Sequence, residues 1–431
     1  MSKPGASITI RPARNISGAL RLPGDKSISH RYAMLAAVAQ GTTRLENFSS
    51  GADCRSTLEC LRTLGVDVQH NHDRAVVIEG AGGNLRAPTR PLDCGNSGST
   101  MRMLAGILAG QRFTAEMIGD ESLSRRPMAR VIEPLTRMGA RIESRNGRPP
   151  LRITGGTLRA LDYRLPLPSA QVKSAVLFAG LFAEGETWVE EPVPTRDHTE
   201  LALIAFGAQV GRAPRRVGLR GGQSLHAIEA SVPGDLSSAA FFLCAAALFP
   251  ESNLVLENLL LNPTRAALLD VLAAMGARPA VLHAEERHGE LAGTIRLQPG
   301  KLHGAVICGA QSAALIDELP VLAAIAPYTQ EGIEIRGARE LRVKESDRIS
   351  AVSSNLRALG VSVEERDDGL RIVGGQQVHG GEVHSFGDHR IAMAFAIAAL
   401  RAGGEVRIQG ADAASISYPE FFAALDRLVE R

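Results

Sequence analysis

The sequence predicts a mixed α/β (α+β) protein of two globular domains, each made of three copies of one repeating unit around buried helices. Two observations carry this prediction. The chain has 431 residues, which is enough for two domains with hydrophobic cores of their own. Six segments along the chain also share one plan, in which each copy combines helices with strands.

Each repeat opens with a short polar or acidic turn, continues as an apolar helix rich in small residues, and ends in a β-like run. The first copy, DKSISHRYAMLAAVAQGTTRLEN (25–47), is typical. Its helix is apolar on all sides, a pattern that favours burial in a core. The six copies begin at Asp25, Asn96, Ser169, Asp235, Asp317 and Asp388.

A second helix follows the β-like run in the first five copies and ends at a glycine before another strand. LRTLGVDV and LTRMGARI are examples. Glycine is the preferred residue just after the last helical turn, so these positions predict helix C-termini. The sixth copy ends instead with YPEFFAALDRLVER (418–431). Each copy therefore contains a helix, a strand, a second helix and further strands.

The turn SVPGD (231–235) separates copies one to three from copies four to six, so we place the domain boundary there. The first helices are expected inside each domain, with their polar N-terminal turns at one end. If the domains face each other by these ends, the positive ends of the helix dipoles line one interdomain cleft. Such a cleft attracts anions.

Composition excludes several other classes. The net charge is +2, so no overall field favours nucleic acid or an anionic membrane. The longest apolar run, 239–250, is too short to cross a bilayer, and the N-terminal sequence lacks the apolar segment of a signal peptide. The five cysteines are scattered, with no spacing typical of a zinc site or a disulfide framework. We expect a cytoplasmic protein without a metal.

Cations gather where the repeat helices begin. GDKSISHR (24–31) places Lys26 and Arg31 at a helix start, where the dipole disfavours positive charge. SRRPM (124–128) places Arg126 before a proline, and FGDHR (386–390) places Arg390 in a first turn. Each motif alone is compatible with solvated surface charge. Their recurrence at helix starts favours bound anions.

Two motifs also carry acids. In LRVKESDRIS (341–350), Lys344, Glu345 and Arg348 form either a surface salt-bridge pattern or a phosphate clamp with a proton-transferring carboxylate. In IDELP (316–320), Asp317 is either the N-cap of the next helix or a catalytic acid. The residues alone leave both alternatives open.

Eight ordered motifs resemble those of the 5-enolpyruvylshikimate-3-phosphate synthases, a family of enolpyruvyl transferases, across nearly the whole chain. They are LPGDKSISHR, GNSGSTMR, SRRPM, SAQVKSA, TRDHTE, DELP, RVKESDR and GDHR. The resemblance implies two domains of three βαβαββ units, with residues 1–22 and 236–431 in one domain and 23–235 in the other, and an active site in the interdomain cleft. It also implies a monomer that acts on 3-phosphoshikimate and phosphoenolpyruvate without a cofactor or metal.

The resemblance assigns roles to individual residues. For 3-phosphoshikimate it implies contacts from Lys26, Ser27, Arg31, Ser169, Gln171, Arg196, Asp317 and Lys344. For phosphoenolpyruvate it implies contacts from Lys26, Gly98, Arg126, Gln171, Arg348 and Arg390. Asp317 is then the base at the shikimate hydroxyl, Glu345 the acid and base at the methylene carbon, and Lys26 a stabiliser of developing charge.

Two positions depart from the pattern of some family members. Ala170 replaces a second serine, and Ile416 stands where a lysine is found near the C-terminus. Gly98 leaves space that an alanine would fill, and the resemblance implies inhibition by glyphosate, which competes with phosphoenolpyruvate.

Two alternative functions remain, a UDP-N-acetylglucosamine enolpyruvyl transferase or a non-catalytic anion-binding repeat protein. The first pairs its early lysine with asparagine and uses a loop cysteine, whereas here Ser27 follows Lys26 and 111–127 contains no cysteine.

Overall fold

The computed structural model describes residues 6–70 and 75–431 and confirms the mixed α/β class. The parts of the predicted domain ranges that fall on residues 1–5 and 71–74 lie outside the described residues. None of the helices in the described part of the chain has both the length and the hydrophobicity that a membrane span requires.

The chain divides into two compact units. Unit 1 contains the residues up to Pro23 together with Pro233–Glu285 and Leu291–Arg431. Unit 2 contains Gly24–Val232 and the short segment Glu286–Glu290. The division read from the sequence places residues 286–290 in the other domain, because that segment lies in the second half of the chain.

Unit 2 repeats one sheet pattern three times within its described residues. In each sheet two neighbouring strands are parallel and the remaining pairs are antiparallel, in the orders β16-β3-β5-β4, β6-β7-β9-β8 and β11-β13-β15-β14. Its strands are β3 (Gln40–Glu46), β4 (Asp67–His70), β5 (Val76–Ala81), β6 (Leu92–Asp93), β7 (Thr114–Ile118), β8 (Arg141–Arg145), β9 (Arg148–Thr154), β10 (Leu158–Arg159), β11 (Asp162–Arg164), β12 (Ala183–Glu184), β13 (Glu186–Glu190), β14 (Val210–Ala213), β15 (Arg216–Arg220) and β16 (Glu229–Ser231). Its helices are α1 (Lys26–Val38), α2 (Ala52–Thr63), α3 (Gly98–Ala109), α4 (Glu121–Ser124), α5 (Ala129–Met138), α6 (Ala170–Gly180) and α7 (His198–Ala205).

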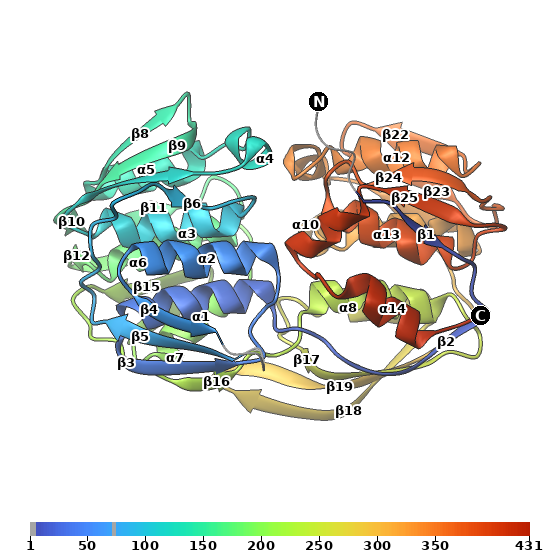
Figure 1. The fold of residues 1–431 in the computed structure, drawn as a ribbon, viewed down its shortest axis with the longest axis horizontal. Helices are drawn as coiled ribbons and strands as arrows, with labels where there is room; N and C mark the ends of the chain where they lie inside the picture. Colours follow the sequence, from blue (N-terminus) through green and yellow to red (C-terminus); the bar gives the residue numbers. More distant parts are fainter. Residues whose placement is uncertain (1–5, 71–74) are drawn as a thin grey trace. The chain divides into compact units, whose positions relative to one another are not determined.

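Unit 1 follows the same plan, with sheets in the orders β18-β19-β17-β2-β26, β20-β21-β23-β22 and β1-β25-β24. Its strands are β1 (Ile8–Ile10), β2 (Asn15–Arg21), β17 (Asn253–Leu260), β18 (Arg278–Arg287), β19 (Glu290–Gln298), β20 (Ala305–Ile307), β21 (Gly332–Ile335), β22 (Val363–Arg366), β23 (Gly369–Val373), β24 (Gly381–His384), β25 (Val406–Gln409) and β26 (Val429–Glu430). Its helices are α8 (Leu236–Ala247), α9 (Ala267–Ala274), α10 (Ala310–Ala314), α11 (Leu319–Ile325), α12 (Arg348–Ala358), α13 (His389–Ala399) and α14 (Phe421–Leu428), with 3₁₀ turns η1 (Ala326–Tyr328), η2 (Arg339–Val343) and η3 (Ala411–Ile416). Figure 1 labels these elements.

Two sheets are completed by strands from distant parts of the sequence. β16 pairs in parallel with β3, so the end of the first half of the chain closes the first sheet. β2 pairs in parallel with β17, so a strand near the N-terminus closes the first sheet of the second half. In both cases the parallel strand of the sheet comes from outside the repeat that supplies the neighbouring strand.

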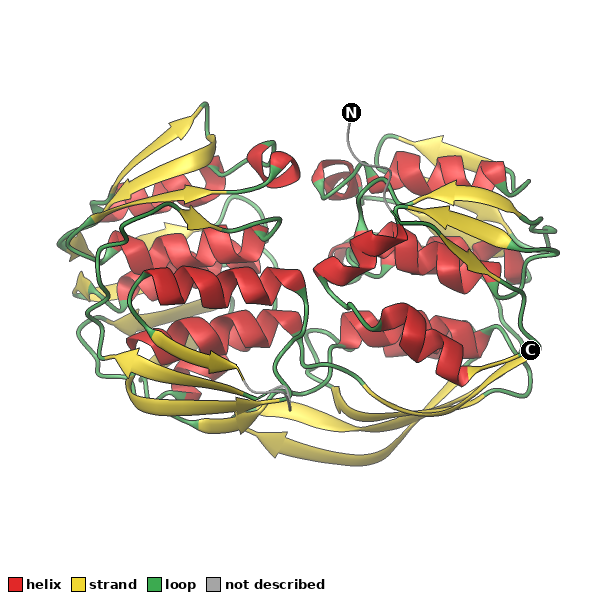
Figure 2. Ribbon diagram, viewed as in Figure 1, coloured by secondary structure: helices red, strands yellow, loops and turns green. Residues whose placement is uncertain are grey.

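The helices that open the repeats form the core of each unit. Within each unit, helices lie inside and strands lie outside (Figure 2). α3 and α6 pack closely in unit 2, and α11 packs against α13 in unit 1. The close approach of α3 to α6 needs a glycine, because a Cβ at Gly106 would lie 2.1 Å from the backbone oxygen of Ala175. Small residues in these helices therefore set how tightly the core packs.

Most helix boundaries follow the sequence prediction. Asp25, Ser169, Asp235 and Asp388 are N-caps whose side chains accept a backbone hydrogen bond. Two predicted starts are wrong by one residue, because Ser97 caps α3 in place of Asn96, and Glu318 stands at the N-cap position of α11 in place of Asp317. The glycines predicted to end the second helices all have positive φ: Gly65, Gly139, Gly207, Gly276 and Gly360.

Candidate active site

Within unit 2, the N-terminal turns of several helices meet through side-chain hydrogen bonds. Gln171, in the first turn of α6, donates through Nε2 to Ser99 Oγ at the start of α3, at 2.9 Å. Its Oε1 accepts from Arg102 Nη1, one turn further along α3, at 2.7 Å. Ser169 caps α6 by accepting from the backbone of Val172. The structure thus brings together the motifs GNSGSTMR and SAQVKSA.

Lys26 is the first residue of α1, which Asp25 caps by accepting from the Ile28 backbone at 2.9 Å. The Lys26 ammonium pairs with Asp53 Oδ2 at 2.9 Å, and both side chains are largely buried. The carboxylate of Asp53 therefore partly neutralises the charge of Lys26, which the dipole of α1 disfavours. Sequence reasoning missed Asp53, whose only signal is its place in the first turn of α2.

Arg31 is almost completely buried, and its guanidinium donates only to neutral oxygens. These are Thr199 Oγ1 at 2.6 Å, the Ser27 carbonyl at 2.8 Å and Ser174 Oγ at 2.9 Å. Among residues 6–70 and 75–431 it has no ion-pair partner. Burial has the largest effect on Arg31 and, together with the nearby positive charge of Arg196, lowers its pKa to about 10, although the charge of Glu200 acts in the opposite direction. A buried cation with a second, half-buried cation nearby is an arrangement that a bound anion stabilises.

Gly98 opens α3 beneath two guanidinium groups. A Cβ at this position would lie 3.0 Å from Arg102 Nη1 and 3.5 Å from Arg126 Nη1. Arg126 donates through Nη2 to Asn96 Oδ1 at 2.6 Å and to Ser122 Oγ at 3.1 Å. A small anion at the start of α3 would therefore meet backbone N–H groups together with two arginines. Arg102 was not among the predicted site residues, although it lies in the motif GNSGSTMR.

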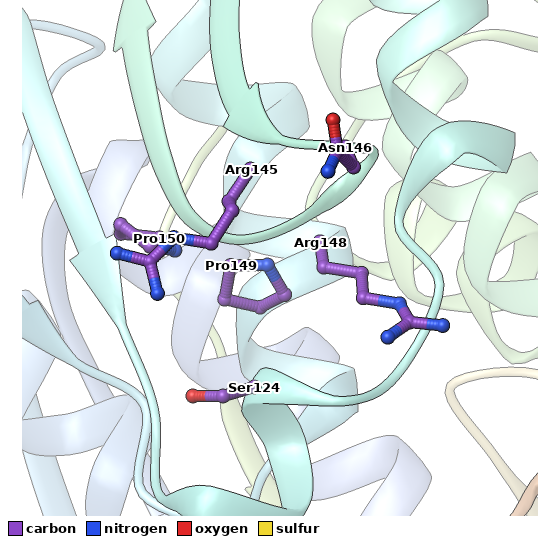
Figure 3. A pocket seen from close by; sticks show the side chains of 6 residues that line it. All are labelled: Ser124, Arg145, Asn146, Arg148, Pro149 and Pro150. Atoms are coloured by element: carbon purple, nitrogen blue, oxygen red, sulfur yellow. The ribbon is translucent and has the colours of Figure 1, made fainter.

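A separate pocket of unit 2 has a volume of about 480 Å³ and is lined by Ser124, Arg145, Asn146, Arg148, Pro149 and Pro150 (Figure 3). None of the predicted site residues lines it. Ser124 ends α4, however, and so lies close in sequence to Arg126. The pocket is a feature of the turn between β8 and β9 rather than of the helix N-termini.

Within unit 1, Arg348 is the centre of an ionic cluster. It is the first residue of α12, is 1% exposed, and donates to Asp388 Oδ2 at 2.8 Å and to Glu345 Oε2 at 2.6 Å. Asp317 Oδ1 lies 3.5 Å from its Nη1. Burial opposes the charge of Arg348, but the carboxylates outweigh burial and raise its pKa. The cluster joins the starts of α12 and α13 and Asp317, which lies two residues before α11.

Asp317 does not occupy the N-cap position of α11, so the N-cap interpretation of this residue is wrong. Instead its Oδ1 lies 3.5 Å from Arg348, 3.9 Å from Arg390 Nε and 4.0 Å from Lys344 Nζ. The Arg390 guanidinium also donates to the Asp317 carbonyl at 2.6 Å. Three cations from two motifs, 341–350 and 386–390, therefore surround one carboxylate.

Asp388 was used only as a helix cap in the sequence prediction, yet it also binds Arg348. Its Oδ1 accepts from the backbone of Arg390 at 2.8 Å, and its Oδ2 accepts from Arg348. Burial opposes ionisation, but the charge of Arg348 prevails and lowers the pKa of Asp388. Glu345 accepts a hydrogen bond from the same guanidinium group, that of Arg348. The structure thus places Asp317, Lys344, Glu345, Arg348 and Arg390 together.

The positions that depart from the family pattern lie on elements that hold predicted site residues. Ala170 is the first residue of α6, directly before Gln171. Ile416 ends the 3₁₀ turn η3, which packs against α13, the helix that carries Arg390. Neither side chain carries a charge or a hydroxyl group.

Comparisons with known proteins cover nearly the full chain. The sequence matches the family described as EPSP synthase (3-phosphoshikimate 1-carboxyvinyltransferase) over residues 10–425. It is 62% identical over 425 residues to the 3-phosphoshikimate 1-carboxyvinyltransferase of Koribacter versatilis, covering 99% of this chain and 100% of that protein. It is 56% identical over 423 residues to the enzyme of the same name from Solibacter usitatus, covering 98% and 99%.

Two solved structures of enolpyruvyl transferases have a similar fold. EPSP synthase from Acinetobacter baumannii has a TM-score of 0.88 and 41% identity, covering 98% of each chain. The enolpyruvyl transferase NikO from Streptomyces tendae shares the fold, with a TM-score of 0.77 at 20% identity over 99% and 98% of the chains. On the repeated α/β fold, the clustered motifs and these full-length matches, the chain belongs to the EPSP synthase (3-phosphoshikimate 1-carboxyvinyltransferase) family.

Proposed function

We propose that the chain transfers the enolpyruvyl group of phosphoenolpyruvate to the 5-hydroxyl of 3-phosphoshikimate, giving 5-enolpyruvylshikimate 3-phosphate and inorganic phosphate. The full-length relatives carry the name of this transferase of the shikimate pathway. The structural observation that supports it most is Arg31, a buried cation with neutral partners beside the charge of Arg196. A phosphorylated substrate supplies an anion that can accept hydrogen bonds directly from the Arg31 guanidinium, which donates only to neutral oxygens in the chain.

We assign the phosphate and hydroxyls of 3-phosphoshikimate to two groups of residues. The unit 2 group is Lys26, Ser27, Arg31, Ser169, Gln171 and Arg196. The unit 1 group is Asp317 and Lys344. The Ser27 hydroxyl makes no hydrogen bond to any other described residue, which leaves it available to a ligand. The guanidinium fork of Arg31 and the point charge of Lys26 suit a phosphate.

We assign phosphoenolpyruvate to Lys26, Gly98, Arg126, Gln171, Arg348 and Arg390. The space above Gly98 is bounded by guanidinium groups that can hold a phosphate or a carboxylate. Because Ile416 offers no charge, the arginines carry this binding without a C-terminal lysine. Arg102, which contacts Gln171, holds that amide in place.

The proposed chemistry is an addition followed by an elimination. Glu345 protonates the methylene carbon of phosphoenolpyruvate while the 5-hydroxyl attacks C2 and gives its proton to Asp317. Glu345 then removes a proton from the new methyl group, and the C–O bond to phosphate breaks as the departing oxygen takes the proton held by Asp317. This releases inorganic phosphate and returns both carboxyl groups to their starting states. Lys26 stabilises negative charge as it develops.

Phosphate release tests this assignment. Wild-type protein should release phosphate only when both substrates are present. Glu345→Gln and Asp317→Ala should each lower kcat by about 10²- to 10⁴-fold, since each removes a proton-transfer group. Glu382→Gln, an exposed change on β24, is the control and should behave like wild type. Normal turnover by either site variant would refute its catalytic role.

The same assay separates the two alternatives. A UDP-N-acetylglucosamine enolpyruvyl transferase would release phosphate with that nucleotide sugar in place of 3-phosphoshikimate, and a non-catalytic binding protein would release none. The full-length relatives are named as 3-phosphoshikimate 1-carboxyvinyltransferases, which matches neither alternative function. We further propose that the enzyme acts as a monomer in the cytoplasm, which light scattering of the purified protein and cell fractionation would test.

A further inference from the structure

The first turn of α7 contains three consecutive buried polar residues, and each is tied to a different element. Thr199 accepts from Arg31 on α1 at 2.6 Å. Glu200 pairs with Lys173 on α6 at 2.7 Å. His198 Nδ1 lies 2.7 Å from Glu290 Oε1, at the start of β19. A run of buried polar groups is costly unless each is paired, so these contacts fix the position of the turn.

Glu290 comes from a distant part of the sequence. It belongs to the segment Glu286–Glu290, the only part of the described chain beyond residue 232 that groups with unit 2. Its side chain is 3% exposed and that of His198 is 0% exposed. A second contact holds the same segment, because His288 Nε2 lies 3.0 Å from the Glu229 carbonyl on β16. Glu290 is therefore built into unit 2.

The geometry defines the interaction. The imidazole Nδ1–H of His198 donates to the carboxylate, whether the ring is neutral or charged. Nε2 of His198 is buried and has no hydrogen-bond partner among the described residues. The ring therefore has one polar anchor, and that anchor is Glu290. Losing it would leave both ring nitrogens unpaired in the interior.

His198 is close to both arginines that we assign to the substrate phosphate, Arg196 along the sequence and Arg31 through Thr199. It follows Arg196 by two positions and directly precedes Thr199, whose hydroxyl accepts from Arg31. The charge of Glu290 is also close enough to affect Arg31, although burial has the larger effect and lowers the pKa of Arg31. A shift of the α7 start would move both arginines relative to each other.

We infer that Glu290 and His198 form a positioning pair that aligns Arg31 and Arg196 for the phosphate of 3-phosphoshikimate. This inference rests on the proposed function. Neither residue touches substrate in this view. The pair acts through the α7 turn, which Lys173 holds independently through Glu200, so that the turn is displaced rather than released when Glu290 is lost.

Steady-state kinetics with both substrates test the inference. Glu290→Ala should raise KM for 3-phosphoshikimate by about tenfold and leave KM for phosphoenolpyruvate within about twofold of wild type. Glu290→Gln keeps an acceptor for the imidazole N–H and should restore KM to within about threefold. Glu286→Gln, an exposed change in the same segment, should have no effect.

Several results would overturn the pair. One is an unchanged KM for 3-phosphoshikimate in Glu290→Ala, and another is an equal rise in KM for both substrates. A third is an equal effect of Glu290→Ala and Glu290→Gln on KM, which would show that the charge of Glu290 matters rather than its hydrogen bond to His198. If Glu290→Ala does not fold, Glu290→Asp, which retains the charge but retracts it, should raise KM for 3-phosphoshikimate alone. Failure of wild-type turnover would refute the proposed function, whereas normal wild-type turnover with unaltered variants would refute only this inference.

Discussion

Arg31, in the second turn of α1, and Arg348, the first residue of α12, are both buried arginines, but their surroundings differ. Arg348 lies among the carboxylates of Asp388, Glu345 and Asp317, so its charge is satisfied within the chain. Arg31 donates only to hydroxyl and carbonyl oxygens. Arg31, which donates to no carboxylate, is thus the one of the two that gains more from an incoming anion.

Replacing Arg31 by lysine should therefore weaken binding of 3-phosphoshikimate. Lysine keeps the charge but cannot donate to three acceptors from one planar group, so we expect KM for 3-phosphoshikimate to rise at least about tenfold. KM for phosphoenolpyruvate should change much less. Arg152→Gln, on the exposed face of β9, is the control. Equal rises in both KM values, measured by phosphate release, would contradict the assignment.

The sequence identified most charged residues of the candidate site but not their partners. Lys26 is identified by its place in a motif, whereas Asp53, its ion-pair partner, lies on another helix and has no signal beyond its place in a first turn. Arg102 was overlooked inside a quoted motif, because its contact with Gln171 depends on how α3 packs against α6. Pairings between elements are set by tertiary packing, which a single sequence does not display.

At the scale of elements, the packing of α3 against α6 depends on one small residue. Gly106→Ala should destabilise the protein by about 1–3 kcal/mol, because the new Cβ would lie 2.1 Å from the Ala175 carbonyl oxygen and force the helices apart. Urea unfolding followed by fluorescence of Trp188, the single tryptophan of the chain, would measure the loss.

Gly156→Ala is the matched control for that substitution. A Cβ at Gly156 meets nothing within 4 Å and its φ is not in the left-handed region, so this change should be neutral or slightly stabilising. Equal midpoints for the two variants would show that the helices separate without cost.

Element boundaries show the limits of prediction at this scale. The apolar helices and the glycines that end the second helices were recognisable because periodicity and φ preference are local properties. The starts of α3 and α11 were each misplaced by one residue. In IDELP the first acid, Asp317, is drawn to the cluster of cations, and Glu318 is left at the N-cap position.

At the scale of the whole molecule, the units should respond differently to acid. In unit 1 the pKa of Asp388 lies below its ordinary value of 3.8, because Arg348 outweighs the opposing effect of burial. Its contribution to stability is therefore complete above about pH 4 and is lost as the pH falls through the lowered pKa. In unit 2, burial raises the pKa of Glu200 despite its pairing with Lys173. Protonation of Glu200 as the pH falls hence favours the folded state.

We therefore expect unit 1 to unfold before unit 2 as the pH is lowered from 7 to 2. Trp188 lies in unit 2 and reports that unit alone, whereas far-ultraviolet circular dichroism reports both. Ellipticity should fall at a higher pH than the one at which Trp188 fluorescence changes. Coincident transitions, or an earlier change in fluorescence, would contradict this expectation.

The pairing of β2 with β17 has a consequence for biosynthesis. Residues 15–21 leave the ribosome long before residues 253–260 have been translated, so the earlier strand waits with an unsatisfied edge while the intervening chain emerges. The segment 24–232 can meanwhile collapse around its own helices. A nascent polypeptide stalled before residue 253 should consequently contain one protease-resistant core and an accessible leading strand.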